Sequence, residues 1–160
     1  MCIRDSVLSL CLLSTAAGRT EDDSNKVWHI VREMERRGIA DVLPTLTQRW
    51  FTDQFIKQHP EIVEARLNQV IDTDSEVFLN VFRIYAGTEM LPWLHEITQP
   101  TLVLTGENDG GCNPRLNRLI ADKLPNSQLL ILPDYKHSIL LEAGSEVAIE
   151  MVKFIQNLQS

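Results

Sequence analysis

Two polar segments of the sequence contain residue types that could act together in catalysis. Asp109 lies in the glycine-rich segment 105–111, and His137 lies in the segment 132–138. Each segment follows an apolar run, and the two residues are 28 positions apart, the length of one strand–helix–strand unit. Because neighbouring parallel strands end at the same edge of a sheet, we expect the two side chains to lie together. A carboxylate that reaches Nδ1 of a histidine fixes its tautomer and stabilises the imidazolium ion. The spacing therefore predicts the orienting acid and the general base of a nucleophilic site.

Nearby polar residues offer alternatives to this pair. Glu107 could replace Asp109 as the orienting carboxylate. Cys112 offers a thiol, but it follows the acid-containing segment and does not lie on a strand-to-helix elbow, so we do not assign it as a nucleophile. Structural roles are predicted for the other three histidines, which lie on predicted helices or at their ends: His29, His59 and His95.

Two apolar runs and the helix between them must position the pair. Residues 101–105 and 128–132 are continuous apolar runs, and Asn113 and Pro114 are typical of the start of a helix. Unalternating apolar runs indicate strands that are buried on both faces of a parallel sheet, joined by right-handed crossovers. The run 7–13 is the third predicted strand. The predicted fold class is α/β, with parallel strands and a helical insertion.

The insertion is almost wholly helical. Ser24 is predicted to cap its first helix, which Gly38 ends. Apolar residues then recur at helical spacing through further segments, which are 39–48, 53–58, 60–71, 75–87 and 91–96. After the last strand, Ser145 is predicted to cap a final helix. Its expected buried face consists of Val147, Ala148, Met151, Val152, Ile155 and Leu158.

Composition excludes several classes of protein. The chain has 160 residues, of which 44% are hydrophobic and 23% are charged, and these values are typical of one globular domain. Its net charge of −7 argues against a binder of nucleic acid or of an anionic membrane. No apolar run is long enough to span a bilayer. The three scattered cysteines fit neither a disulfide framework nor a zinc site. We therefore expect a thiol-reducing, cytoplasmic protein.

The first residues allow more than one interpretation. Residues 1–17 can be read as a signal peptide, with an apolar stretch followed by small residues, and this would make the protein exported. The alternative is that 7–13 is a short buried strand, which we prefer. Residues 1–6 also resemble the translation of a transposon adapter used in sequencing libraries, which predicts an artefact that replaces the natural sequence before Val7.

The carboxyl-terminal part of the sequence resembles the α/β-hydrolase superfamily. An apolar strand, Gly106-x-x-Asp109, a helix begun by Pro114, a second strand and a loop His137 followed by Glu142 occur in the order typical of that superfamily, over residues 98–155. Within the insertion, Leu43-Pro44-x-Leu46, Arg49-Trp50-Phe51-Thr52 and His59-Pro60-Glu61 are similar to the cap of the 3-oxoadipate enol-lactonases. Two features depart from the pattern, namely Lys136 in place of the usual glycine and the segment 85–90.

The resemblance implies a division of the chain and roles for its residues. Residues 7–18 would be a core strand and turn, 19–97 a helical lid or cap, and 98–160 the carboxyl-terminal core. Asp109 would be the triad acid and His137 the general base, while Glu142 would be structural. Candidate substrate-binding residues in or near the lid are Arg49, Trp50, Phe51 and Trp93, with Arg49 suited to a substrate carboxylate.

The nucleophile of the superfamily is absent from this sequence. It lies in Gly-x-Ser-x-Gly, and no serine here has glycine at both the −2 and the +2 position. The resemblance therefore implies an amino-terminally truncated fragment of a serine hydrolase for a small ester or lactone, inactive by itself. It implies no metal and no organic cofactor. Two alternatives stay open: a dehalogenase or C–C bond hydrolase of the same fold, and a non-catalytic binding module. The oligomeric state is not predicted.

Overall fold

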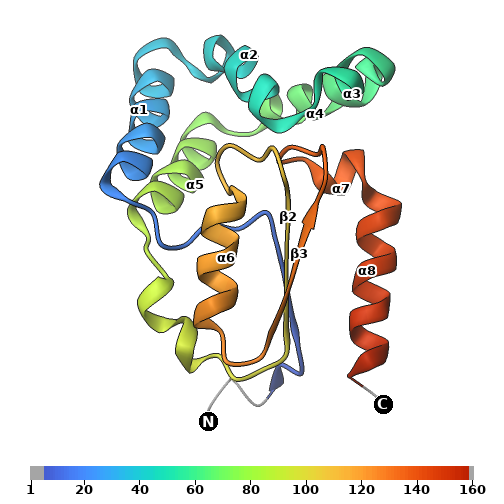
Figure 1. Ribbon diagram of the computed structural model, residues 1–160. Coiled ribbons are helices and arrows are strands. Elements are labelled where there is room, and N and C mark those ends of the chain that lie inside the picture. The colour runs from blue at the N-terminus through green and yellow to red at the C-terminus, as the bar shows by residue number, and fades with distance from the viewer. Residues whose placement is uncertain (1–5, 159–160) are drawn as a thin grey trace. The chain divides into compact units, whose positions relative to one another are not determined.

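The computed structural model describes residues 6–158 and divides the chain into two compact units (Figure 1). The first, here called the sheet unit, contains the residues up to Gly18 and those from Met90 onward. The second, the helical unit, is Arg19–Glu89. Met1 to Asp5, which include most of the adapter-like hexapeptide and Cys2, lie outside the described residues.

The described part of the sheet unit contains a parallel sheet of three strands. These are β1 (Leu10–Leu13), β2 (Thr101–Gly106) and β3 (Ser127–Leu132), in the order β1-β2-β3. Leu12 pairs with Val103, and Val103 pairs with Leu129. Every residue of β2 is buried, as expected for a central strand with an unalternating apolar sequence. The predicted α/β fold with parallel strands is confirmed.

Helices cover both faces of this sheet (Figure 1). They are η2 (Leu91–Glu96), α6 (Pro114–Lys123), α7 (Ile139–Glu142) and α8 (Gly144–Asn157). Because alternate strand residues point to opposite faces, Val103 packs with Ile120 of α6 while Leu102 and Leu104 pack with Val147 of α8. Two apolar clusters, one on each face, therefore hold the sheet in place.

The helix α6 follows the predicted start signals. The Asn113 side chain accepts a hydrogen bond from the Leu116 backbone N–H, and Pro114 occupies the first turn. Helix α8 differs from the prediction at its start, because its N-cap is Ala143 and Ser145 already lies inside the helix. Its predicted apolar face is also only partly buried, since Ala148, Val152, Ile155 and Leu158 are exposed.

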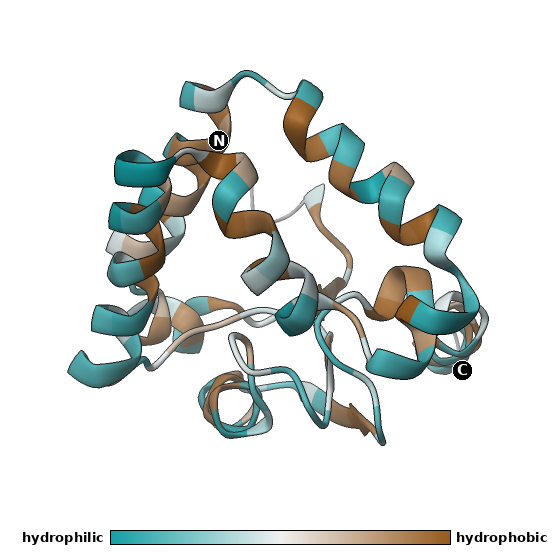
Figure 2. Ribbon diagram, turned by 90° about the horizontal axis from the view of Figure 1, so that it is seen from above, coloured by the Kyte–Doolittle hydropathy of each residue, from teal (hydrophilic) through white to brown (hydrophobic). Residues whose placement is uncertain are grey.

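The helical unit consists of five helices within its described residues. They are α1 (Glu21–Arg37), α2 (Ile39–Trp50), α3 (Asp53–Gln58), α4 (Pro60–Asp72) and α5 (Ser75–Gly87). The helices present apolar stripes alongside polar ones (Figure 2), and Met34, Leu43 and Val70 meet in one apolar cluster. Gly38 joins α1 to α2 at a φ of 89°, a conformation that favours glycine.

The first helix begins earlier than predicted. Its N-cap is Thr20, not Ser24, and Thr20 forms a capping box with Asp23: the Asp23 N–H donates to Thr20 Oγ1, and the Thr20 N–H donates to the Asp23 carboxylate. Three acidic residues in the first turn favour this start, because negative charge is stabilised at a helix N-terminus.

Among the described residues, no helix combines the length and the apolar character that crossing a bilayer requires.

Candidate active site

The segments after β2 and β3 are bound to each other by backbone contacts. The Glu107 N–H donates to Leu132 O at 2.8 Å, and the Asn108 N–H donates to Tyr135 O at 2.8 Å. Gly106 makes this approach possible, since a Cβ placed there would lie 2.3 Å from Lys136 O. The two segments that carry Asp109 and His137 are therefore fixed side by side, as the strand order predicted.

The central contact of the site is between Asp109 and His137. His137 Nδ1 lies 2.8 Å from Asp109 Oδ2. The Asp109 side chain is fully buried, whereas the His137 side chain is 38% exposed. The other carboxylate oxygen, Oδ1, accepts the backbone N–H groups of Gly111 at 2.9 Å and Cys112 at 2.8 Å. The carboxylate is thus held by the loop that follows it, with one oxygen directed at the imidazole.

The electrostatics of the pair favour an imidazolium–carboxylate ion pair. Burial alone would lower the pKa of His137, but hydrogen bonds with Asp109 and with the Cys112 side chain raise that pKa from 6.5 to about 10. Burial alone would raise the pKa of Asp109, but the contacts with His137 and the two backbone N–H groups hold it below its usual value of 3.8. The two charges stabilise each other.

Three further residues, which the sequence did not indicate, support the site. Thr105 Oγ1 donates to Cys112 O at 2.8 Å, and Asn117 Nδ2 lies 2.7 Å from the same carbonyl and 3.1 Å from Thr15 O. Ser14 Oγ donates to His137 O at 3.2 Å. These bonds connect the segments after all three strands. In the sequence, these residues could have been recognised only as polar residues within an apolar pattern, as Asn117 is on α6.

Glu107 does not take the place of Asp109. Its carboxylate accepts the backbone N–H of Asp134 at 3.2 Å, and Asp134 has a positive φ of 64°. This contact stabilises the turn that leads to His137. Glu107 therefore stabilises the turn before His137, and Asp109 is the carboxylate in contact with the imidazole.

The candidate substrate-binding residues lie in different parts of the fold. Phe51 is fully buried and stacks on Phe55, with ring centroids 5.6 Å apart, so it packs in the core of the helical unit. Trp50 packs beside it, with the Arg66 guanidinium 5.6 Å from its ring centroid. Trp93, on η2 of the sheet unit, is 58% exposed. A role of these residues in substrate binding stays a prediction.

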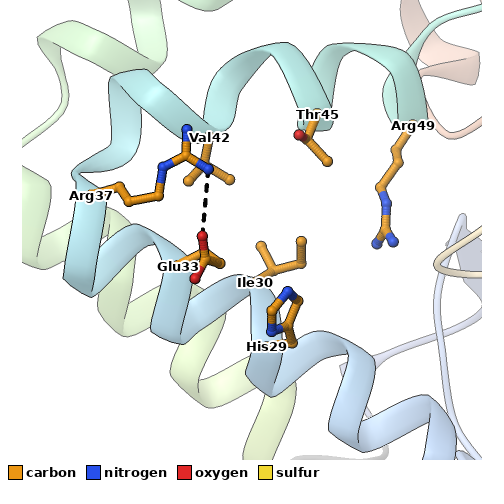
Figure 3. A pocket seen from close by; sticks show the side chains of 7 residues that line it. All are labelled: His29, Ile30, Glu33, Arg37, Val42, Thr45 and Arg49. Carbon is orange, nitrogen blue, oxygen red and sulfur yellow. Dashed lines mark hydrogen bonds and ion pairs between the residues drawn. The ribbon is translucent and has the colours of Figure 1, made fainter.

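Arg49 lines a cavity of about 230 Å³ between α1 and α2 (Figure 3). Thr45 and Arg49 extend from α2 towards the side of α1 that carries His29 (Figure 3). Glu33 and Arg37, which also line the cavity, form an ion pair at 3.4 Å. Of the candidate substrate-binding residues, Arg49 lines this cavity, whereas Trp50 and Phe51 do not.

One group of side chains in the described part of the chain has the composition of a metal site. One ligand atom each from Asp109, Cys112 and His137 lies within 4.8 Å of the others. The sequence showed no metal-binding spacing because the fold brings Cys112 and His137 together from distant segments.

Comparison with known proteins identifies the fold. No family model matches the chain. A poly(3-hydroxyalkanoate) depolymerase from Ectopseudomonas oleovorans is 44% identical over 71 residues, which are 44% of this chain and 24% of that protein. The 3-oxoadipate enol-lactonase 2 of Acinetobacter baylyi is 28% identical over 103 residues, which are 64% of this chain and 38% of that protein. The chain thus spans between a quarter and two-fifths of these curated relatives.

Solved structures match almost the whole chain. An enol-lactonase from Burkholderia xenovorans LB400 has a TM-score of 0.86 at 22% identity, over 95% of this chain and 57% of that one. A thermophilic esterase from Thermogutta terrifontis has a TM-score of 0.82 at 20% identity, over 99% of this chain and 59% of that one. The predicted resemblance to α/β-hydrolases and enol-lactonases is confirmed, and the chain has the fold of the carboxyl-terminal part of an α/β-hydrolase.

Proposed function

We propose that this chain supplies the acid and the base of a serine hydrolase that cleaves a small ester or lactone. The observation that carries the proposal is the 2.8 Å contact between His137 Nδ1 and the buried Asp109 carboxylate. In this assignment His137 is the general base, Asp109 orients it, and the serine nucleophile belongs to a polypeptide segment outside these 160 residues. Relatives named as enol-lactonases and an esterase support the substrate class.

The proposed reaction uses His137 as a proton carrier. Its Nε2 accepts the proton of the serine hydroxyl while the serine oxygen bonds to the carbonyl carbon of the substrate. The imidazolium then donates this proton to the leaving oxygen as the ester or lactone bond breaks. Water repeats the sequence on the acyl-enzyme and releases the carboxylic acid. Asp109 stays ionised throughout and compensates the charge of the imidazolium.

The pKa of His137 sets a requirement on the polypeptide segment that would supply the serine. A general base must be unprotonated before it acts, whereas a pKa of about 10 keeps His137 charged at neutral pH. A serine hydroxyl and a substrate packed against the exposed edge of the ring would remove water from the imidazolium ion and lower its pKa. We therefore propose that the chain alone is inactive, because it has no serine nucleophile and because water still solvates the His137 imidazolium.

The proposal also covers organisation and location. The helical unit is proposed as the lid. Residues 90–97, which the sequence placed in the lid, belong to the sheet unit and are proposed as part of the core with 7–18 and 98–160. Arg49 and Trp93 are the candidates for contact with the substrate. The proposed location is the cytoplasm, a reducing compartment in which the Cys11 and Cys112 side chains stay as thiols.

The test is complementation with a relative. The part of the Burkholderia xenovorans enol-lactonase that precedes the region matched by this chain is fused in front of Val7. Hydrolysis of 3-oxoadipate enol-lactone and of p-nitrophenyl acetate is then measured. Any acid–base pair in the fusion comes from this chain, so we expect hydrolysis by the fusion and none by the 160-residue chain.

Substitutions in the fusion identify the residues. Asp109→Asn and His137→Gln are each expected to reduce kcat at least about a thousandfold, because the serine then lacks a correctly oriented base. His95→Gln, at an exposed histidine of the same unit, is the matched control and should retain activity. Equal rates for the variants at 137 and 95 would contradict the assignment, as would a folded fusion that hydrolyses neither substrate.

A further inference from the structure

The loop after β2 places a thiol beside the Asp109–His137 pair. Cys112 is only 3% exposed, and its side chain is hydrogen-bonded to His137. The ligand-capable atoms of Asp109, Cys112 and His137 all lie within 4.8 Å of one another. Sulfur, imidazole nitrogen and carboxylate oxygen are the three ligand types that zinc takes in proteins. The hydrolase chemistry proposed above makes no use of this thiol.

The surroundings of the cluster already orient the carboxylate. Asp109 Oδ1 is occupied by the N–H groups of Gly111 and Cys112, so Oδ2 is the oxygen directed at His137. Thr105 Oγ1 lies 3.4 Å from the same Oδ2. The Cys112 carbonyl is itself held by Thr105 Oγ1 at 2.8 Å and by Asn117 Nδ2 at 2.7 Å. Hydrogen bonds of this kind fix the orientation of metal ligands and raise affinity.

We propose that Asp109 Oδ2, Cys112 Sγ and His137 Nδ1 bind a zinc ion or a similar thiophilic divalent cation. Three protein ligands leave a fourth position for water, and the partly exposed His137 ring marks the route of entry. Ligand atoms of a tetrahedral zinc site are about 3.3–3.6 Å apart. The Asp109–His137 contact at 2.8 Å would therefore open slightly on binding. The three ligand atoms, which already lie within 4.8 Å of one another, would adjust to these separations.

Bound metal would replace the hydrogen bond between Asp109 and His137. The carboxylate and the thiolate would neutralise the two charges of the ion, and Nδ1 would give its lone pair to the metal instead of a proton to Asp109. Bound metal would therefore inhibit any reaction that depends on the hydrogen bond between Asp109 and His137. Magnesium and calcium, which prefer oxygen ligands, do not fit a site with a sulfur and a nitrogen.

The test is spectroscopic and does not depend on hydrolase activity, so its outcome is separate from that of the proposed function. The metal-free chain is titrated with Co²⁺, whose charge-transfer absorption in the near ultraviolet reports a bound thiolate, and Zn²⁺ is then added in competition. We expect the band to appear and Zn²⁺ to abolish it. Cys112→Ser should remove the band. His137→Gln should weaken Zn²⁺ binding at least about tenfold, because even the loss of a residue that hydrogen-bonds to a metal ligand lowers metal affinity by about that factor.

The other cysteines provide the control. A variant with Cys2→Ser and Cys11→Ser keeps only Cys112, and it should retain the band and the Zn²⁺ affinity. Far-ultraviolet circular dichroism verifies that each variant is folded. In the unmodified chain, Zn²⁺ should also slow alkylation of Cys112 but not of Cys11. Mass spectrometry measures the alkylated fraction of each cysteine over time. A band that survives Cys112→Ser, or alkylation of Cys112 unaffected by Zn²⁺, would overturn the proposal.

Discussion

At the scale of single residues, the charge of His137 makes stability depend on pH. Its pKa is raised in the folded chain from 6.5 to about 10, so the ion pair with Asp109 contributes its full stabilisation below about pH 6.5. The contribution is lost as the pH rises through about 10, because the folded state then releases the proton that holds the pair together. Urea unfolding between pH 6.5 and 10, with a chelator present, measures this loss.

The variant His137→Gln isolates the effect from other groups that titrate at high pH. Its free energy of unfolding should fall less between pH 6.5 and 10 than that of the unmodified chain, while His95→Gln should behave like the unmodified chain. Parallel pH profiles for all three proteins would show that folding does not raise the pKa of His137.

Gly106 is a second residue whose substitution has a defined outcome. A Cβ at this position would lie 2.3 Å from Lys136 O and 2.4 Å from Tyr135 O, and backbone atoms cannot rotate away as a side chain can. Gly106→Ala should therefore cost about 1–3 kcal/mol or more, the usual range for overpacking, and should separate the loops of Asp109 and His137. The measurement is the urea midpoint of unfolding.

Gly110 provides the matched control for this substitution. It lies in the same loop, and a Cβ there would meet nothing within 4 Å. Gly110→Ala should leave the midpoint close to that of the unmodified chain. If both alanine variants are equally stable, the close approach of the two loops is not a constraint on the fold.

At the scale of elements, the start of α1 rests on the capping box of Thr20 and Asp23. Thr20→Ala removes the acceptor for the Asp23 N–H and should destabilise the helical unit by about 1 kcal/mol. Ser24→Ala is the control, because Ser24 lies inside the helix and should change stability by less than about 0.5 kcal/mol. Thermal unfolding followed by circular dichroism compares the two. A larger loss for Ser24→Ala would place the cap where the sequence predicted it.

This helix also shows why the sequence predicted elements better than their ends. The helical periodicity of α1 was evident, but its acidic first turn resembled a solvent-exposed loop. The favourable interaction of those carboxylates with the helix N-terminus becomes evident only once the helix direction is known. At α8 the serine and the apolar pattern were both present, yet the chain enters the helix directly from α7 through Ala143.

The candidate site could be predicted in part for a similar reason. Asp109 and His137 were identifiable because each follows an apolar run and parallel strands end at a common edge. The support from Asn117 and the approach of Cys112 to His137 could not be predicted, because they depend on which face of α6 points inward and on the path of the loop. Only tertiary structure determines these two properties.

At the scale of the whole molecule, α8 leaves an apolar surface exposed. Ile149 is 53% exposed, Val152 51% and Ile155 44%, and these residues lie within two turns of one helix. The sequence predicted Val152 and Ile155 to be buried from their apolar character, and the described part of the chain does not bury them. The pattern of α8 thus predicts contact with another apolar surface.

Exposed apolar surface of this kind should make the isolated chain associate with itself. We expect size-exclusion chromatography with light scattering to show species larger than a monomer, and a hydrophobic dye to bind. Val152→Lys combined with Ile155→Glu places charges on the surface without altering net charge, and should shift the chain towards monomer and reduce dye binding. The control, Ser145→Lys with Gln156→Glu, changes exposed polar residues of the same helix and should do neither. A monodisperse unmodified monomer that binds no dye would show that the α8 surface is stable in water, and would then favour the non-catalytic binding module over the hydrolase fragment.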